Sequence, residues 1–235
     1  MSEIFLKLRI KEMLKGNMKR YLIFGFVEIF LVVAGILIAL SINNWNNKKT
    51  QRSDELNIYK NIQSRISEDR EDLEAVIDYN NKYTAQFEYA SNLIEAKDIA
   101  SLDTLVSLTT NLFKYSDFSK SSNVYQNLLN SGELKLLQNR EVLTMLQDLE
   151  ETYIYLNRME SIHQQLVTEI LAPELIKNLH LSSSEVERPD ELFSFHYHNF
   201  FTLSISIMEE KDEIYQRALR EIDIISQLLE EELDS

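Results

Sequence analysis

One long apolar run near the N-terminus limits the architecture of this chain more than any other feature. Residues 21–42 (YLIFGFVEIFLVVAGILIALSI) contain only two strongly polar side chains, Glu28 and Ser41. At about 1.5 Å per residue, the run forms roughly 33 Å of helix, enough to cross a hydrocarbon core of about 30 Å. A soluble core helix would carry a polar stripe, which this run lacks. We therefore predict a transmembrane helix over residues 21–43.

The flanks of this run favour a retained signal anchor. A largely polar segment precedes it, and the run is longer than the apolar core of a cleaved signal peptide. Six basic residues stand before the run and three follow it within ten residues. This bias favours an N-terminus in the cytoplasm. We expect a single-pass protein of the cytoplasmic (inner) membrane, with its C-terminal domain in the periplasm.

Residues 1–20 form the predicted cytoplasmic segment. Positions 4–15 (IFLKLRIKEMLK) alternate apolar and basic side chains at helical spacing. That pattern favours a short amphipathic helix on the inner leaflet, and a solvated basic tail is the alternative. Either form suits an anionic membrane surface.

Glu28 shares one face of the predicted membrane helix with small residues. A charged carboxylate near the bilayer centre costs a few kcal/mol on insertion scales. Small residues four positions apart let two helices approach closely. We expect this face to bind another helix, either in a homo-oligomer or in another membrane protein. A protonated, lipid-facing glutamate and a proton or ion pathway are the alternatives. Steps of three and four residues place these residues on the face: Gly25, Glu28, Val32, Gly35 and Ala39.

Aromatic and amide side chains mark the two ends of the predicted span. Aromatic residues settle at the membrane–water interface, where we expect the side chains of Tyr21 and Trp45. Asparagine side chains can break a helix or continue it while bonding headgroups. Continuation is favoured here, because no Gly or Pro occurs between Gly35 and Gly132. The expected interfacial residues are Tyr21, Asn43, Asn44, Trp45 and Asn46.

Two stretches of the sequence resemble a known family. GFVEIFLVVAGILIALSINNWNN (residues 25–47) is similar to the N-terminal signature of an uncharacterised bacterial family with one membrane span, common in Bacteroidota. YQNLLNSGELKLLQNREV (residues 125–142) resembles a later segment of that family. Phe26 and Val27 separate Gly25 from Glu28, where the family usually has Gly next to Glu. The resemblance implies a shared architecture and implies no activity.

Charge divides the chain into two parts. Residues 1–52 hold nine Lys/Arg and three Glu, a balance of +6, whereas the remainder holds 15 Lys/Arg and 35 Asp/Glu, a balance of −20. Phosphates repel such an acidic surface, which argues against nucleic acid as a partner. The chain has no cysteine, which excludes disulfides and thiolate chemistry. The lipid bilayer is the partner that the basic end suits.

The acidic part, residues 44–235, is predicted to be helical throughout. Only 4 Gly and 2 Pro occur in the chain, too few for a turn-rich β fold. Heptad spacing from Tyr59 to Ile94 predicts a long helix with one packed stripe, interrupted by Asp69 and Asn80. The charged run 68–74 is expected to be a solvated face. The stripe positions are Tyr59, Ile62, Ile66, Asp69, Leu73, Val76, Asn80, Tyr83, Phe87, Ala90 and Ile94.

Local signals place the remaining helices. We expect a short helix from Ser101 to about residue 114, and a second one through Leu129, capped by Ser122 or Asn123. A left-handed Gly132 then ends it. Asn139 caps a long helix that Pro173 kinks or ends, a loop follows at residues 181–190, and a last helix runs over about 191–233. The fold class is all-α: one transmembrane helix followed by an extended antiparallel helical bundle.

Candidate chemistry is sparse in this sequence. His163 lies on an apolar stripe and is expected to be a buried histidine with its hydrogen bonds satisfied. Glu160-x-x-His163 is one pair of the di-iron type, but the sequence has no second pair. His196 and His198 are two apart, unlike the i, i+4 pairs of metal-binding helices. The aromatic segment around them is expected to plug the bundle, with a ligand pocket as the alternative, formed by Phe193, Phe195, His196, His198, Phe200 and Phe201.

These observations predict a non-enzymatic membrane protein. No phosphate-binding, nucleophile-elbow or zinc-helix motif occurs in the sequence, so we expect neither catalysis nor a cofactor. The leading hypothesis is a structural or scaffolding protein that associates through its membrane helix and presents a helical bundle in the periplasm. An extracytoplasmic sensor or ligand-binding module is the first alternative. An accessory subunit of an ion-driven membrane complex, acting through Glu28, is the second.

Overall fold

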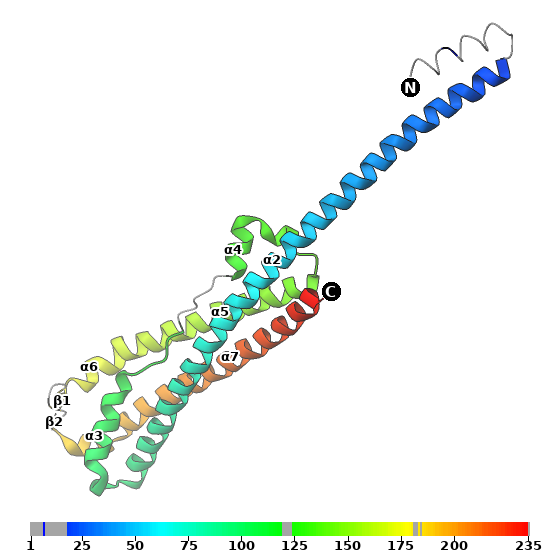
Figure 1. The fold of residues 1–235 in the computed structure, drawn as a ribbon. Coiled ribbons are helices and arrows are strands. Elements are labelled where there is room, and N and C mark those ends of the chain that lie inside the picture. Colours follow the sequence, from blue (N-terminus) through cyan, green and yellow to red (C-terminus); the bar gives the residue numbers. More distant parts are fainter. Residues whose placement is uncertain (1–6, 8–17, 119–123, 181–182, 184, 235) are drawn as a thin grey trace. The chain divides into compact units, whose positions relative to one another are not determined.

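The computed structural model describes residues 7, 18–118, 124–180, 183 and 185–234. These residues form helices joined by short connections and one two-stranded hairpin (Figure 1). The predicted all-α class is therefore confirmed. The chain divides into two compact units, Met1–Asp54 and Glu55–Ser235, which we call the anchor unit and the bundle unit.

Helix α2 is a single α-helix from Met18 to Ala96. Its anchor-unit portion contains a segment that is long and apolar enough to cross a membrane, and its most apolar stretch buries no residue. The helix continues through Asn43–Asn47 without a break, as predicted from the lack of Gly and Pro. Ser41, the hydroxyl residue of the apolar run, donates a hydrogen bond to the carbonyl of Leu37 over 2.8 Å. Its polar group is thus satisfied within the helix.

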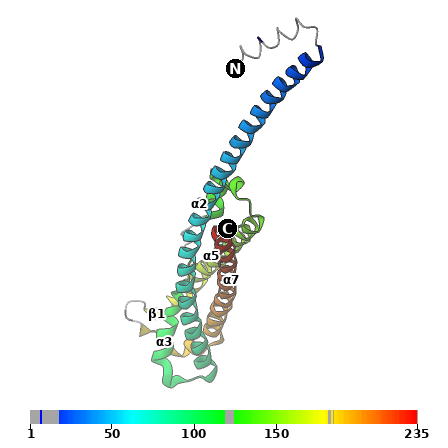
Figure 2. The same cartoon turned by 45° about the vertical axis from the view of Figure 1, so that its right-hand side comes forward.

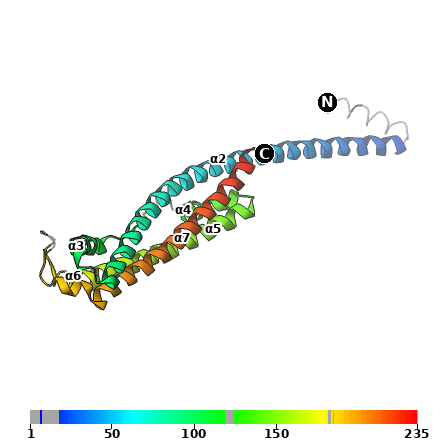
Figure 3. The ribbon, with the colours of Figure 1, turned by 90° about the horizontal axis from the view of Figure 1, so that it is seen from below.

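Three long helical segments build the bundle unit: the part of α2 from residue 55, α5 (Arg140–Gln165) and α7 (Phe195–Asp234). Helices α5 and α7 lie side by side in opposite directions, since Thr152 bonds Glu221 and Asn139 bonds Glu232 (Figure 3). Helix α2 runs parallel to α5, because Glu55 bonds Gln138 just before α5 and Asp69 bonds Tyr153 further along both helices. It runs antiparallel to α7, because Arg70 pairs with Asp223 and Asn80 bonds Met208. The short helices α3 (Leu102–Thr110) and α4 (Val124–Ser131) return the chain from the end of α2 to the start of α5.

The short elements lie toward the two ends of the bundle (Figures 1 and 2). At one end are the 3-10 turn η1 (Ile99–Ser101), α3 (Leu102–Thr110) and η2 (Asn111–Phe113). At the other end are α4 (Val124–Ser131) and η3 (Glu133–Leu136). Gly132 between them has φ +77°, which confirms the left-handed position. The predicted cap of α4 at Ser122 or Asn123 lies outside the described residues.

Helix α5 begins as predicted and ends differently. The side-chain oxygen of Asn139 accepts from the amides of Glu141 and Val142 over 2.9 and 3.2 Å, which confirms the cap. Beyond Gln165 the helix widens into a π-helical stretch, η4 (Leu166–Leu171), before α6 (Ala172–Leu175). Pro173 lies in the first turn of α6, but the residues before it are already helical, with the Ala172 amide donating to the Val167 carbonyl. Its missing amide proton therefore falls inside a continuous helical run, directly after the π-helical distortion, and the chain stays helical to Leu175.

The segment before α7 contains structure that the sequence pattern did not predict. Strands β1 (Leu179–His180) and β2 (Glu185–Val186) form an antiparallel hairpin. A 3-10 turn, η5 (Pro189–Phe193), follows. Ser194 is extended, and α7 begins at Phe195 rather than near residue 191.

The interior of the bundle unit holds two hydrophobic clusters. The first joins residues 58–77 of α2 to the N-terminal half of α5 and the C-terminal half of α7. The second joins residues 87–94 of α2 to α3, η4, α6 and the start of α7. The predicted heptad stripe is buried, apart from the partly exposed Val76 and Tyr83. Asp69 is also buried, so the charged run 68–74 is a solvated face with one inward carboxyl group.

Candidate functional site: a buried polar layer

A layer of polar side chains separates the two hydrophobic clusters. On each long helix it occupies the interval between them, residues 78–86 on α2, 157–165 on α5 and 209–213 on α7, and Tyr215, whose ring belongs to the first cluster, adjoins it. A further member comes from residues 114–118, which link η2 to the segment before α4 and which we call the strap. All members are at most 5 % exposed. The polar layer consists of Asn80, Ser116, Glu160, His163, Lys211 and Tyr215.

Lys211 and Ser116 form the centre of the layer. The Lys211 ammonium donates to the Ser116 carbonyl over 2.9 Å and to its Oγ over 2.6 Å. The Ser116 hydroxyl in turn donates to Asn80 Oδ1 over 2.9 Å, and Asn80 Nδ2 donates to the Met208 carbonyl over 2.8 Å. A chain of hydrogen bonds therefore joins α2, the strap and α7.

Glu160 connects α5 to the same network. Its Oε1 accepts a hydrogen bond from the Phe118 amide over 2.7 Å and one from the Tyr215 hydroxyl over 2.8 Å. The Phe118 ring packs against Tyr153 with centroids 5.3 Å apart. Two backbone groups therefore hold the strap in place. The Ser116 carbonyl accepts from the Lys211 cation, and the Phe118 amide donates to the Glu160 carboxyl group.

Burial shifts the acid–base behaviour of the layer. Burial raises the pKa of Glu160 to about 7, against the lowering effects of the Phe118 amide, Tyr215 and Lys211. Burial lowers the pKa of Lys211 to about 8, and the nearby Glu160 and Asp117 carboxyl groups offset part of that shift. Burial together with the Glu160 charge raises the pKa of Tyr215. In each case loss of water around the charged form is the dominant cause.

His163 is buried, as predicted, but its hydrogen bonds are not satisfied. Neither ring nitrogen has a hydrogen-bond partner among the described residues. Its ring packs against Tyr115 with centroids 5.8 Å apart. Burial, and secondarily the Lys211 charge, lowers the pKa of His163 to about 3. The imidazole therefore stays neutral and fills space as an aromatic ring, and the expectation of satisfied hydrogen bonds was wrong.

The layer has the residue types of a Ser–Lys catalytic pair but not its hydrogen-bond directions. A nucleophilic serine must give its proton to the base. Here Ser116 gives its proton to Asn80 and receives one from Lys211. Glu160 and His163 are three residues apart on α5, the spacing of a di-iron ligand pair. The Lys211 ammonium beside them would repel a metal cation bound there. Among the described residues no group of three or more His, Cys, Asp or Glu could hold a metal ion.

The aromatic segment before and within α7 faces several directions. Phe200 and Phe201 are buried in the second cluster, where Phe201 packs against Phe87 with centroids 5.7 Å apart. Phe193 is partly buried against the same cluster. Phe195 is 80 % exposed. Part of the segment therefore packs between helices, and the alternative of a ligand pocket stays a prediction.

The two histidines of this segment pair with carboxyl groups from other helices. His196 lies 3.9 Å from Glu174 and contacts the Phe200 ring with centroids 4.4 Å apart. His198 Nε2 lies 3.2 Å from Glu95 Oε1.

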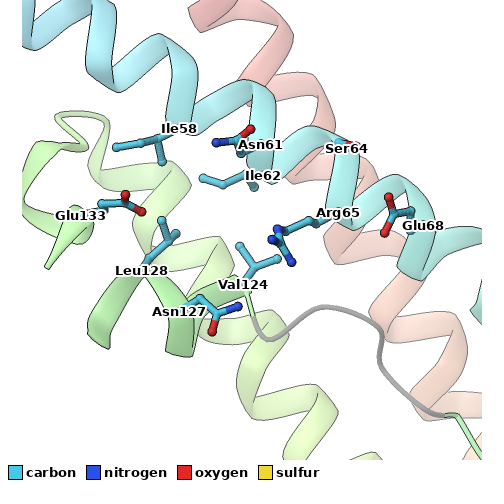
Figure 4. A pocket seen from close by; sticks show the side chains of 10 residues that line it. All are labelled: Ile58, Asn61, Ile62, Ser64, Arg65, Glu68, Val124, Asn127, Leu128 and Glu133. Carbon is cyan, nitrogen blue, oxygen red and sulfur yellow. The ribbon is translucent and has the colours of Figure 1, made fainter. Parts of the chain in front are cut away.

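A surface groove lies between α2 and α4 (Figure 4). Its volume is about 440 Å³. Apolar side chains, among them Ile62 and Leu128, form part of its wall, and Arg65, Glu68 and Glu133 line it as well (Figure 4). Residues 127, 128 and 133 of its lining belong to the segment 125–142, one of the two stretches that resemble the family.

The predicted membrane-association face lies on α2 in the anchor unit. Glu28, Val32, Gly35 and Ala39 are exposed, and Gly25 is partly exposed. Among the described residues, no atom lies within 4 Å of a Cβ atom added at Gly25 or Gly35. The face therefore has room for another helix to approach.

The predicted interfacial residues lie on the same helix. Asn43, Asn44 and Asn46 are exposed, as is Trp45, whose ring lies 5.8 Å from Lys49 Nζ. Tyr21 belongs to α2, and its side chain lies outside the described residues, as do most of residues 1–17.

Together these features define an all-α protein with one long apolar helix and a helical bundle divided by a buried polar layer. The chain belongs to the family of unknown function DUF6090, whose model matches residues 28–170, more than half of the chain. The match includes four members of the polar layer, whereas Lys211 and Tyr215 lie beyond it. No curated protein and no solved structure matches the chain.

Proposed function

We propose that this protein is a membrane-anchored scaffold that associates through its membrane helix and presents a helical bundle in the periplasm. The observation that carries the proposal is the exposure of the apolar segment of α2, whose most apolar stretch buries no residue. A contiguous apolar surface of this length needs a covering, and lipid is the covering that its length fits. The resemblance to single-span proteins of Bacteroidota, which have an inner membrane and a periplasm, supports the location.

The orientation rests on charge. Six basic residues before the apolar segment outweigh three after it, which favours an N-terminus in the cytoplasm. A reporter fused after Ser235 tests this topology. A reporter that works only in the periplasm is expected to be active, and one that works only in the cytoplasm is expected to be silent. The opposite result would refute the orientation.

Association is proposed to use the face of Gly25, Glu28, Val32, Gly35 and Ala39. The open space at both glycines lets a second backbone approach, and a carboxyl group can hydrogen-bond across two helices in lipid. The partner is a second copy of the chain or another membrane protein. No part of this proposal requires catalysis or a cofactor.

Purification of the full chain in mild detergent tests the association. Two variants alter the face, Glu28→Leu and Gly35→Ile. Two matched controls alter the opposite side of the helix, Phe30→Leu and Leu37→Ile. The face variants are expected to reduce assembly size or lose partners relative to wild type, and the controls are not. The same assembly size and partners in all five proteins would refute the association face.

The groove between α2 and α4 favours a second candidate function, an extracytoplasmic ligand-binding module. Its volume of about 440 Å³ falls within the usual range for small-molecule sites, and its lining combines apolar side chains with Arg65 and two carboxyl groups, Glu68 and Glu133. A thermal-shift screen of small polar molecules tests it, with Arg65→Gln as the variant. A ligand that stabilises wild type and not Arg65→Gln would support sensing. The role of an accessory subunit in an ion-driven complex stays a prediction.

A further inference from the structure

The strap, residues 114–118, crosses the bundle core without forming a helix. Lys114 is extended, and the side chains of Ser116 and Phe118 are 2 % exposed. Its Ser116 carbonyl binds Lys211, and its Phe118 amide binds Glu160. Its Ser116 hydroxyl donates to the side-chain amide oxygen of Asn80. Three helices therefore hold the strap: α7 through a cation, α5 through a carboxyl group and α2 through an amide.

The groups around Glu160 have opposing effects on its charge. From α7, the Lys211 ammonium attracts an ionised carboxylate and the Tyr215 hydroxyl donates to it. From the strap, the exposed Asp117 carboxylate repels it. His163 lies one turn further along α5 and is neutral, and α2 contributes the uncharged Asn80 to the layer. The carboxylate is also deprived of water, which is the largest cost.

We propose that residues 114–118 are a proton-linked strap, which closes over Glu160 when that carboxyl group is neutral and opens as it ionises. In the closed state the neutral carboxyl group keeps the Phe118 amide bond without the cost of a buried charge. In the open state Glu160 releases its proton to water and is hydrated, and the Asp117 carboxylate moves away from it. The bonds from Lys211 to Ser116 are lost in the same opening.

The direction of the pH effect follows from linkage. The pKa of Glu160 is about 7 when the strap is closed, and an exposed glutamate has a pKa of about 4.5. The closed state therefore holds the proton more tightly, and rising pH favours opening. Between these two values the Glu160 proton by itself lowers the ratio of closed to open protein by up to about tenfold per pH unit. Opening also uncovers His163, whose ring packs against Tyr115 of the strap and whose pKa burial lowers to about 3, so its protonation opposes this fall below about pH 6.5. The His163→Phe variant isolates the Glu160 effect. Above about pH 7 Glu160 is ionised in both states, and the ratio levels off.

Amide hydrogen exchange of the full chain in detergent micelles tests the proposal. The protection factor of the Phe118 amide, corrected for the intrinsic exchange rate, is measured from pH 5 to pH 7.5. In His163→Phe it is expected to fall by up to about tenfold per unit and to level off near pH 7. In the double variant Glu160→Gln/His163→Phe, where glutamine is a neutral isostere, it is expected to stay constant.

Two further variants keep the test informative if Glu160→Gln does not fold. Asp117→Asn changes an exposed side chain and removes a repulsion that raises the Glu160 pKa, so levelling is expected at lower pH. Glu221→Gln is the matched control, because that half-buried carboxyl group bonds Thr152 and not the strap. The wild-type pH profile is expected to persist in this control.

Three results would overturn the proposal. One is a Phe118 protection factor in His163→Phe that does not change between pH 5 and pH 7. Another is an equal pH-dependent loss of protection at Ile214 in the core of α7, which would indicate global unfolding. The third is an unchanged levelling pH in Asp117→Asn.

Discussion

The Lys211 ammonium lies 2.6 Å from the Ser116 hydroxyl oxygen, although 95 residues separate them in the sequence. The same ammonium bonds the Ser116 carbonyl over 2.9 Å. A fully buried ammonium is stable only when hydrogen bonds replace its water. The strap supplies these bonds, so the cation of α7 and the backbone of the strap stabilise each other inside the bundle.

Removing the buried cation is expected to destabilise the bundle strongly. Lys211→Met keeps most of the side-chain volume and removes the charge, so the Ser116 carbonyl and hydroxyl lose their donor. A hydrogen bond to a charged group contributes about 1.5–3 kcal/mol. Urea unfolding followed by circular dichroism at pH 7.5 measures the loss.

A double-mutant cycle assigns part of that loss to the hydroxyl contact. Lys211→Met and Ser116→Ala are measured singly and together. Groups that share a hydrogen bond couple by about 0.5–3 kcal/mol. Additive losses would show that the 2.6 Å contact contributes nothing to stability.

Glu160 and His163 are expected to give opposite pH dependences of stability. The folded pKa of Glu160 is raised to about 7, so its contribution is lost as pH rises from about 4.5 to 7. The folded pKa of His163 is lowered to about 3, so its contribution is lost as pH falls from about 6.5 to 3. Each slope is about 1.4 kcal/mol per pH unit, and the two cancel between about pH 4.5 and 6.5.

Single variants separate the two contributions. Relative to wild type, Glu160→Gln is expected to lose stability as pH falls through this window, because only the histidine effect remains. His163→Phe is expected to gain stability over the same window. At pH 7.5 His163→Phe should be at least as stable as wild type, since neither ring nitrogen has a partner among the described residues. Denaturant unfolding at pH 5.0, 5.75 and 6.5 checks both signs; parallel profiles in the two variants contradict the assignment.

The sequence predicted the elements whose causes are local. The heptad spacing from Tyr59 to Ile94 predicted the buried stripe of α2, Asn139 predicted a helix start and Gly132 a left-handed residue. Each of these sequence features determines the conformation of residues within a few positions of itself. The parallel direction of α2 and α5, the hairpin and the π-helical stretch after Gln165 depend on contacts between distant elements. Sequence periodicity carries no information about those contacts.

The polar layer was only partly visible in the sequence. Asn80 and His163 stood out, because each interrupts or occupies an apolar stripe. Lys211 carried a weaker signal, four residues after Ile207 and three before Ile214 in a segment otherwise rich in charge. Ser116 carried none, since the strap has neither periodicity nor a motif. What makes Ser116 important is a cation on a helix that begins almost 80 residues later.

Two tyrosines two residues apart on α5 test whether burial increases the contribution of a hydrogen bond to stability. The Tyr153 hydroxyl donates to the buried Asp69 over 3.1 Å, and the exposed Tyr155 hydroxyl donates to Glu210 over 2.9 Å. Tyr153→Phe is expected to cost about 1.5–3 kcal/mol, because a hydrogen bond to a desolvated carboxyl group is lost. Tyr155→Phe is expected to leave the unfolding midpoint unchanged, because water replaces the lost bond. Equal effects in the two variants would show that burial does not determine the strength of these bonds.

Gly132 gives a prediction that separates backbone conformation from packing. Its φ of +77° lies in the left-handed region, and an added Cβ atom would meet nothing within 4 Å. Gly132→Ala is therefore expected to destabilise the bundle by about 1–2 kcal/mol through backbone strain alone. Gly132→Asn is expected to cost less, because asparagine tolerates this conformation better than alanine does. Thermal melting of the three proteins checks the order glycine, asparagine, alanine; a less stable asparagine variant would point to a side-chain clash instead.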